Sequence, residues 1–158
     1  MIRPCEARDL AAVGRIINEA ALAYRGAIPA DRWHEPYMPE AELAAEIAKG
    51  VRFWGWEENG ELLGVMGLQE VKDATLIRHA YVLTRLQRGG IGSALMAALA
   101  PQARGRLLVG TWAAAHWAIR FYQRNGFRLV GAEEKDRLLD TYWTIPARQR
   151  EVSVVLVR

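Results

Sequence analysis

A glycine-dense basic turn, QRGGIGSAL at residues 87–95, is the segment of this sequence best suited to chemistry. A helix is expected to begin inside it, although glycine in a helix costs about 1 kcal/mol relative to alanine. The first N–H groups of a helix lack intrahelical partners and lie at the positive end of its dipole, so they bind anions such as a pyrophosphate. Arg88 would add charge there and Ser93 a hydroxyl. A glycine-rich turn without any ligand is the alternative.

Two other nucleotide-binding patterns fail at this turn. No glycine precedes a Lys-Ser or Lys-Thr pair, which excludes the P-loop pattern GxxxxGK[ST]. The dinucleotide pattern GxGxxG begins at Gly90 and Gly92 but meets Leu95 in place of its third glycine, and no acidic residue follows about 20 positions on. An anion is therefore expected to bind chiefly through the backbone amides at the start of the helix, with Arg88 and Ser93 beside them.

Together with the preceding strand, which ends in HAYV, the turn resembles motif A of the GCN5-related N-acetyltransferase (GNAT) superfamily, Gln/Arg-x-x-Gly-x-Gly/Ala. Gln87, Gly90 and Gly92 occupy its fixed positions. The resemblance implies that acetyl-coenzyme A is the cosubstrate, with its pyrophosphate on the amides of the turn and its pantetheine arm paired with the preceding strand. The cofactor-binding residues expected on this basis are Ala80, Tyr81, Val82, Gln87, Arg88, Gly89, Gly90, Ile91, Gly92, Ser93, Ala115 and Tyr122.

A second segment, AAAHWAIRFYQRNGF at residues 113–127, resembles motif B of the same superfamily. Its pattern is matched by Ala118, Tyr122, Gly126 and Phe127. One position departs from it, because the family often has an asparagine seven residues before the tyrosine and this chain has Ala115. His116 would point about 100° away around a helix. The asparagine contact with the cofactor is in doubt here, whereas the backbone contacts remain expected.

The reaction implied by the resemblance is direct attack of a neutral amine on the thioester of acetyl-coenzyme A. An alkyl ammonium with a pKa of about 10.4 must first lose a proton, and the departing thiolate, whose thiol has a pKa of about 8.5, gains from a hydrogen-bond donor. Tyr122 matches the family's tyrosine for this donor role. A core aromatic on an amphipathic helix is the alternative explanation of Tyr122.

Two residues are candidates for the base that receives the proton of the amine. His79 lies on the strand expected beside the acetyl group, and imidazole titrates near neutral pH. Strand alternation puts His79 on one face with Ile77 and Tyr81, but a β-bulge would change that face. Glu70, at the end of the neighbouring strand, is the second candidate and would act through water. A histidine held by a structural partner is the alternative for His79.

Aromatic residues in two loops are expected to wall the acceptor pocket, since these regions do so in the family. They are Trp33 and Tyr37 in the first loop and Tyr142 and Trp143 in the last. Packing beneath long loops would also explain them. A single cysteine, Cys5, with only three scattered histidines predicts neither a zinc site nor a cysteine hydrolase.

Periodicity and turn signals predict the elements that position these residues. Helices are expected at 10–26, 39–50, 91–103 and 116–126, and strands near residue 2, on both sides of the hairpin signal Asn59-Gly60, and at 74–84, 106–114, 127–132 and 152–158. Asp9 is available to cap the first helix, and 133–151 is a long connection. The order predicts an α/β or α+β fold with a single mixed, mostly antiparallel sheet of about seven strands and about four helices. The resemblance implies a GNAT-like acyl-CoA acyltransferase fold.

Length and composition favour one domain over residues 1–158. No apolar run approaches the ~18 residues of a membrane span, and one cysteine fits a reducing compartment, so a cytoplasmic location is expected. The net charge of +3 could attract nucleic acid or a phosphorylated cofactor. Because the basic residues are spread along the chain, the small anion is favoured, and neither a nucleic-acid nor a membrane partner is expected.

The sequence therefore predicts an enzyme, a metal-free N-acetyltransferase that moves an acetyl group from acetyl-coenzyme A to a primary amine of a small molecule or a peptide. The absence of residues beyond the core fold slightly favours a small acceptor. A non-catalytic acyl-coenzyme A sensor is the alternative, and Ala115 keeps it open. An exposed final strand would offer a second subunit a route to a homodimer.

Overall fold

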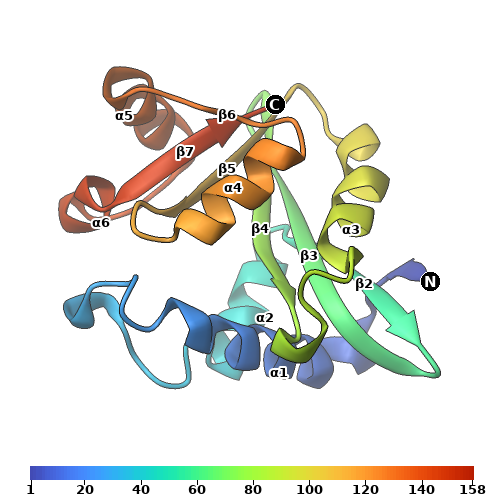
Figure 1. The fold of residues 1–158 in the computed structure, drawn as a ribbon. Coiled ribbons are helices and arrows are strands. Elements are labelled where there is room, and N and C mark those ends of the chain that lie inside the picture. Colours follow the sequence, from blue (N-terminus) through green and yellow to red (C-terminus); the bar gives the residue numbers. More distant parts are fainter.

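The computed structural model describes residues 1–158, folded into seven strands and six α-helices, with a long connection between the first two α-helices (Figure 1). The elements are β1 (Ile2–Pro4), α1 (Leu10–Ala21), α2 (Glu40–Ala48), β2 (Arg52–Glu58), β3 (Glu61–Val71), β4 (Ala74–Val82), α3 (Ile91–Leu99), β5 (Arg106–Trp112), α4 (His116–Arg124), β6 (Arg128–Leu129), α5 (Ala132–Tyr142), α6 (Ala147–Glu151) and β7 (Ser153–Val157). The expected hairpin joins β2 to β3, with Asn59 and Gly60 both at positive φ. The longest α-helix has 12 residues, and none combines the length and apolar character that a bilayer crossing requires.

All seven strands belong to one mixed sheet in the order β1-β2-β3-β4-β5-β7-β6. Every neighbouring pair is antiparallel except β4 and β5, which the crossover through α3 makes parallel. Helices cover both faces (Figure 1): Ile16 of α1 packs in one core with Val65 of β3, and Met96 of α3 packs in another with Met66. The predicted fold class is confirmed.

The sheet splits in its middle, between β4 and β5. These strands pair only through Ala74–Leu76 and 106–108, and beyond that point they diverge (Figure 1). Near the split β4 carries a β-bulge, because Val65 of β3 pairs with Tyr81 whereas Gly67 pairs with Arg78. A Cβ on Gly67 would lie 2.8 Å from the carbonyl oxygen of Arg78, so only glycine permits this close approach. The split and the bulge shape the candidate site.

The last connection differs from the sequence-based expectation. Residues 133–151 are not an irregular loop, since most of them belong to α5 and α6. Leu138 and Leu139 of α5 are buried in a core with Val155 of β7, which supplies the packing that fixes the helix. The expectation of an exposed final strand is also wrong, because β7 pairs with β5 on one side and β6 on the other. The two-residue β6 covers β7 at Leu156 and Val157, so a second subunit cannot pair with that part of the strand.

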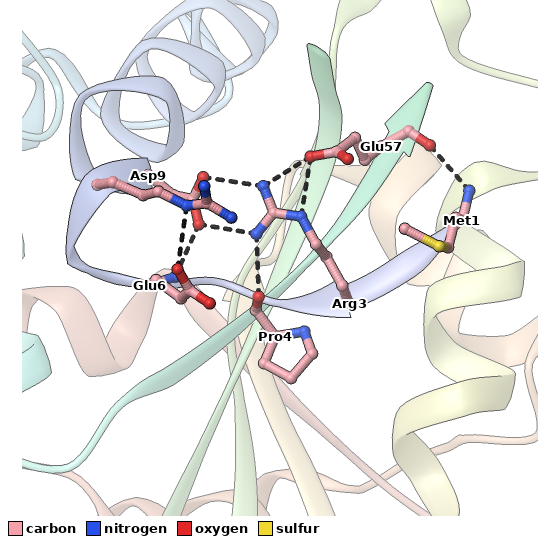
Figure 2. A network of polar contacts seen from close by, with 7 residues as sticks. Met1, Arg3, Pro4, Glu6, Asp9 and Glu57 are labelled. Atoms are coloured by element: carbon pink, nitrogen blue, oxygen red, sulfur yellow. Dashed lines mark hydrogen bonds and ion pairs between the residues drawn. The ribbon is translucent and has the colours of Figure 1, made fainter. Parts of the chain in front are cut away.

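Asp9 does not cap α1 as expected but holds the N-terminal strand in place. Figure 2 shows the guanidinium of Arg3 between the carboxylates of Asp9 and Glu57. Its Nη1 and Nη2 atoms donate to Asp9 over 2.8 and 2.9 Å, and Nε donates to Glu57 over 2.8 Å. The hydrogen bonds from Arg3 and from the Glu6 amide lower the pKa of Asp9 to about 2. This network ties β1 to β2 and to the start of α1.

Candidate active site

A cleft of about 190 Å³ opens where β4 and β5 separate. It is lined by residues 77–81 of β4 and 109–112 of β5, by Tyr122 of α4, and by Tyr37 and Trp143 from the two segments expected to wall an acceptor pocket. Most lining side chains are aromatic or aliphatic and none is acidic. Such walls suit an extended apolar chain that ends in a polar group.

The glycine-dense turn between β4 and α3 presents unpaired backbone donors. The N–H groups without a hydrogen-bond partner in the protein are those of Arg88, Gly90, Ile91, Gly92 and Ser93. Arg88 and Gly90 have φ values of 71° and 88°, and residues 87–90, which form the turn before α3, are exposed. A Cβ on Gly92 would lie 3.0 Å from Cε1 of Phe121, so this glycine lets α3 lie close to α4. The turn can therefore hold an anion at the start of a nine-residue helix.

Two side-chain hydrogen bonds connect this turn to neighbouring elements. Nε2 of Gln87 donates to the carbonyl oxygen of Val82 over 3.2 Å, which closes the turn onto the end of β4. The hydroxyl of Ser93 accepts a hydrogen bond from Nδ2 of Asn125 over 3.2 Å, which links α3 to the end of α4. Because pairing with β5 ends at Leu76, the backbone edge of Ala80–Val82 is open toward the cleft. An extended ligand could add there as a strand.

Tyr122 offers a free hydroxyl to this cleft. The side chain is buried, and its ring packs edge-on against Phe121 and Phe127. Its hydroxyl makes no hydrogen bond within the protein and is not sealed from solvent. Burial, and to a lesser extent the neighbouring phenol of Tyr24, raise the pKa of Tyr122 well above its ordinary value. The group is therefore a protonated hydrogen-bond donor at neutral pH.

His79 stands at the bulge of β4 with a φ of 55°, the left-handed region that few non-glycine residues adopt. It lines the cleft, and its Nε2 atom lies 2.9 and 3.0 Å from the two carboxylate oxygens of Glu46 on α2. Its ring is nearly parallel to those of Phe53 and Tyr81. Burial raises the pKa of Glu46, but the hydrogen bond from His79 and the charges of His79 and Arg78 outweigh it, so that pKa lies below its ordinary value.

The family model of the acetyltransferase (GNAT) family matches residues 15–127, which include the split strand, the turn and α4. The chain belongs to this family. It is an acetyl-coenzyme A-dependent N-acetyltransferase, as the sequence predicts.

Among its relatives is the peptidyl-lysine N-acetyltransferase YiaC of Escherichia coli strain K12, which is 29% identical over 145 residues, 90% of this chain and 93% of the relative. The GNAT fold recurs in solved structures. The PaiA N-acetyltransferase of Thermoplasma acidophilum, in complex with coenzyme A, has a TM-score of 0.73 at 15% identity and covers 100% of this chain and 97% of its own. The ribosomal-protein-S18-alanine N-acetyltransferase of Escherichia coli has a TM-score of 0.68 at 20% identity, with 99% and 91% covered.

Ala115, where GNAT members often have an asparagine, is fully buried at the start of α4. Its side chain packs in the core with Ala118 and Tyr122. It offers no polar side-chain contact to a cofactor.

Three other predicted site residues of this GNAT chain lie away from the cleft. Glu70 is exposed near the C-terminal end of β3, with its Oε1 atom 3.5 Å from Nη2 of Arg52. Tyr142 is the last residue of α5, and its hydroxyl donates to Asp73. Trp33 lies behind Tyr37, with ring centroids 5.7 Å apart, and does not itself line the cleft. The structure therefore brings His79, Tyr122, Tyr37 and Trp143 together, but not these three.

Among the residues of the candidate site that sequence reasoning missed are Tyr24, Trp112 and Glu46. Tyr24 and Trp112 line the cleft, but both are aromatics in ordinary patterns and carried no signal. Glu46 did carry one, because it lies three positions after the buried Leu43 and so shares the buried face of α2. A carboxylate on a buried helix face needs a partner, and that partner is His79.

Proposed function

We propose that this GNAT enzyme acetylates a primary amine carried at the end of an extended apolar arm, by direct attack on acetyl-coenzyme A in a ternary complex. The lysine side chain of a peptide is the acceptor favoured here, and a small alkyl amine is the other member of the same class. The observation that carries the proposal is the free hydroxyl of Tyr122 in a cleft that is also lined by Ala80 and Tyr81, near the end of β4 that leads into the exposed turn.

The turn and the open edge of β4 are the proposed cosubstrate site. The unpaired amides of residues 90–93 would hold the pyrophosphate, and the positive charge of Arg88 would add to the helix dipole. The backbone of Ala80–Val82 would pair with the pantetheine arm as an added strand. This arrangement directs the thioester toward Tyr122.

The proton steps are assigned to two residues that line the cleft. His79 would accept the proton of the incoming ammonium, because only the neutral amine can attack the thioester carbonyl. Tyr122 would donate a hydrogen bond to the departing sulfur. Since the raised pKa of Tyr122 opposes early proton loss, its proton would follow only as the C–S bond breaks.

The acceptor class follows from the walls of the cleft. Tyr24, Tyr37 and Trp143 present aromatic surface to an alkyl chain and π faces to an ammonium group. No carboxylate lines the cleft, so recognition of the cation by an ion pair is not provided. The peptidyl-lysine specificity in the name of the 29% identical relative points the same way.

The test is free-thiol release from acetyl-coenzyme A with a panel of lysine peptides, alkyl amines and α-amino acids. We expect the lysine peptides to have the highest kcat/KM and the α-amino acids the lowest. Preference for α-amino acids would overturn the acceptor assignment. Tight cofactor binding without thiol release from any amine would instead favour the acyl-coenzyme A sensor.

A further inference from the structure

Glu46 and His79 form a carboxylate–imidazole pair at the edge of the candidate active site. Glu46 projects from α2 and His79 from the bulge of β4, and their side chains are 15% and 12% exposed. Arg78 also donates to Glu46, over 2.6 Å, while its other nitrogen donates to Gln69. In a regular strand Arg78 and His79 would face opposite sides of the sheet, so the bulge is what lets both reach one carboxylate.

The backbone conformation of His79 is unfavourable, because its φ of 55° lies in the left-handed region. A non-glycine residue in the left-handed region is strained, because its Cβ lies too close to the following carbonyl oxygen. Neighbouring groups fix the orientation of the imidazole ring. The rings of Phe53 and Tyr81 lie beside it with centroids 6.1 and 6.4 Å away, and Glu46 is hydrogen-bonded to its Nε2 atom. A strained residue fixed in this way beside a cleft is characteristic of a functional position.

The pair determines which nitrogen of the neutral ring carries the hydrogen. An ionised carboxylate only accepts hydrogen bonds, so Nε2 of His79 must be the donor to Glu46. The neutral imidazole then has an unprotonated Nδ1 with a free lone pair. Nδ1 makes no hydrogen bond within the protein and is not sealed from solvent.

We infer that Glu46 is a positioning residue of the proposed acetyl transfer, which fixes the Nε2–H form of His79 and so leaves Nδ1 to take the proton of the acceptor ammonium. In this step the N–H bond of the ammonium breaks and an Nδ1–H bond forms, which gives a neutral amine and an imidazolium beside the Glu46 carboxylate. The amine then attacks the thioester carbonyl, and the C–N bond forms as the C–S bond breaks. The departing sulfur takes the proton of Tyr122, the second proton lost by the nitrogen returns to the Tyr122 oxygen through solvent, and the imidazolium releases its proton to solvent. The inference rests on the proposed function.

Other titratable groups also act on this pair. The charges of Lys49, which follows the last residue of α2, and of Arg78 on β4 act on Glu46. The phenols that share the cleft with the imidazole are those of Tyr24, Tyr37, Tyr81 and Tyr122. Glu46 is the only carboxylate bonded to His79. A change at Glu46 should therefore act mainly through His79.

The tautomer of the neutral His79 imidazole can be determined by NMR spectroscopy without any assay of activity. Nitrogen-15 correlation spectra of the wild-type chain contain imidazole signals from only three histidines, and His79→Gln identifies one of them by its loss. We expect the neutral ring of His79 to carry its hydrogen on Nε2. A hydrogen on Nδ1 overturns the inference even in an active enzyme, whereas absence of thiol release from every amine overturns the proposed function.

A double-mutant cycle tests whether Glu46 acts through His79. We expect Glu46→Gln to lower kcat about tenfold or more and to move the acidic limb of the kcat/KM profile to lower pH, with KM for acetyl-coenzyme A within about twofold. In a His79→Gln background the same change should add less than about twofold. Glu42→Gln, which removes a charge from an exposed position of the same helix, is the matched control and should leave kcat unchanged.

If Glu46→Gln lowers kcat by the same factor in the wild-type and His79→Gln backgrounds, Glu46 does not act through His79 and the inference is overturned. A lower melting midpoint with unchanged kcat would show a purely structural role for Glu46 and would also overturn it. The glutamine variant keeps the size of the side chain and can still bond to both partners, so we expect it to fold. If it does not fold, the wild-type tautomer decides.

Discussion

Tyr122 and His79 line one cleft but are anchored in different layers of the protein. Tyr122 packs in the core formed with α3, whereas His79 lies beside Phe53 in the core formed with α1 and α2. The donor to the leaving group and the base for the amine are thus held by separate packing. Their roles can be tested by separate substitutions.

Tyr122→Phe should lower kcat by about 10²-fold, because it removes the hydroxyl proposed to meet the departing sulfur. The hydroxyl makes no hydrogen bond within the protein, so the melting midpoint should not fall. Affinity for acetyl-coenzyme A, measured by calorimetry, should stay within about threefold. An unchanged kcat would remove Tyr122 from the mechanism.

His79→Gln and Glu70→Gln distinguish the two candidate bases. We expect the first to lower kcat about 10²-fold or more, since His79 lines the cleft. The second should change kcat by less than about twofold, because Glu70 pairs with exposed arginines outside the cleft. Thiol-release kinetics at saturating amine measure both. The reverse ranking would assign the base to Glu70 acting through water.

Gly92→Val should weaken the binding of acetyl-coenzyme A at least tenfold. The added side chain meets Phe121 and must either move α3 or cover the free amides of the turn. The matched control is Gly131→Val at the start of α5, where φ is −75° and a Cβ meets open space. A melting curve with and without cofactor reports the loss, since a ligand that binds the native state raises the midpoint.

Asp9 makes the free energy of unfolding depend on pH. Its folded pKa of about 2 lies below the ordinary value of 3.8, so its contribution is complete above about pH 4 and is lost as the pH falls toward 2. Asp9→Asn should therefore lower the free energy of unfolding, on the order of 1 kcal/mol near pH 6, and the difference from wild type should shrink at pH 2. Urea unfolding at both pH values measures this. A difference that grows in acid contradicts the assignment.

Much of the framework could be predicted because its causes are local. The Asn59-Gly60 turn, the amphipathic period of α1 and the glycines before α3 each depend on a few neighbouring residues. The same local patterns located the turn and Tyr122 and carried the family resemblance. The segment 133–151 was misjudged because α5 is fixed by leucines that pack on distant β7.

The sequence by itself therefore determined the family, the order of the elements as far as β6, and the position of the glycine-rich turn. Only the tertiary structure decided the face of His79, its partner Glu46 on another element, and the burial of β7 between two strands. Backbone propensity acts over a few residues, whereas strand register, bulges and ion-pair partners depend on which distant segments come together.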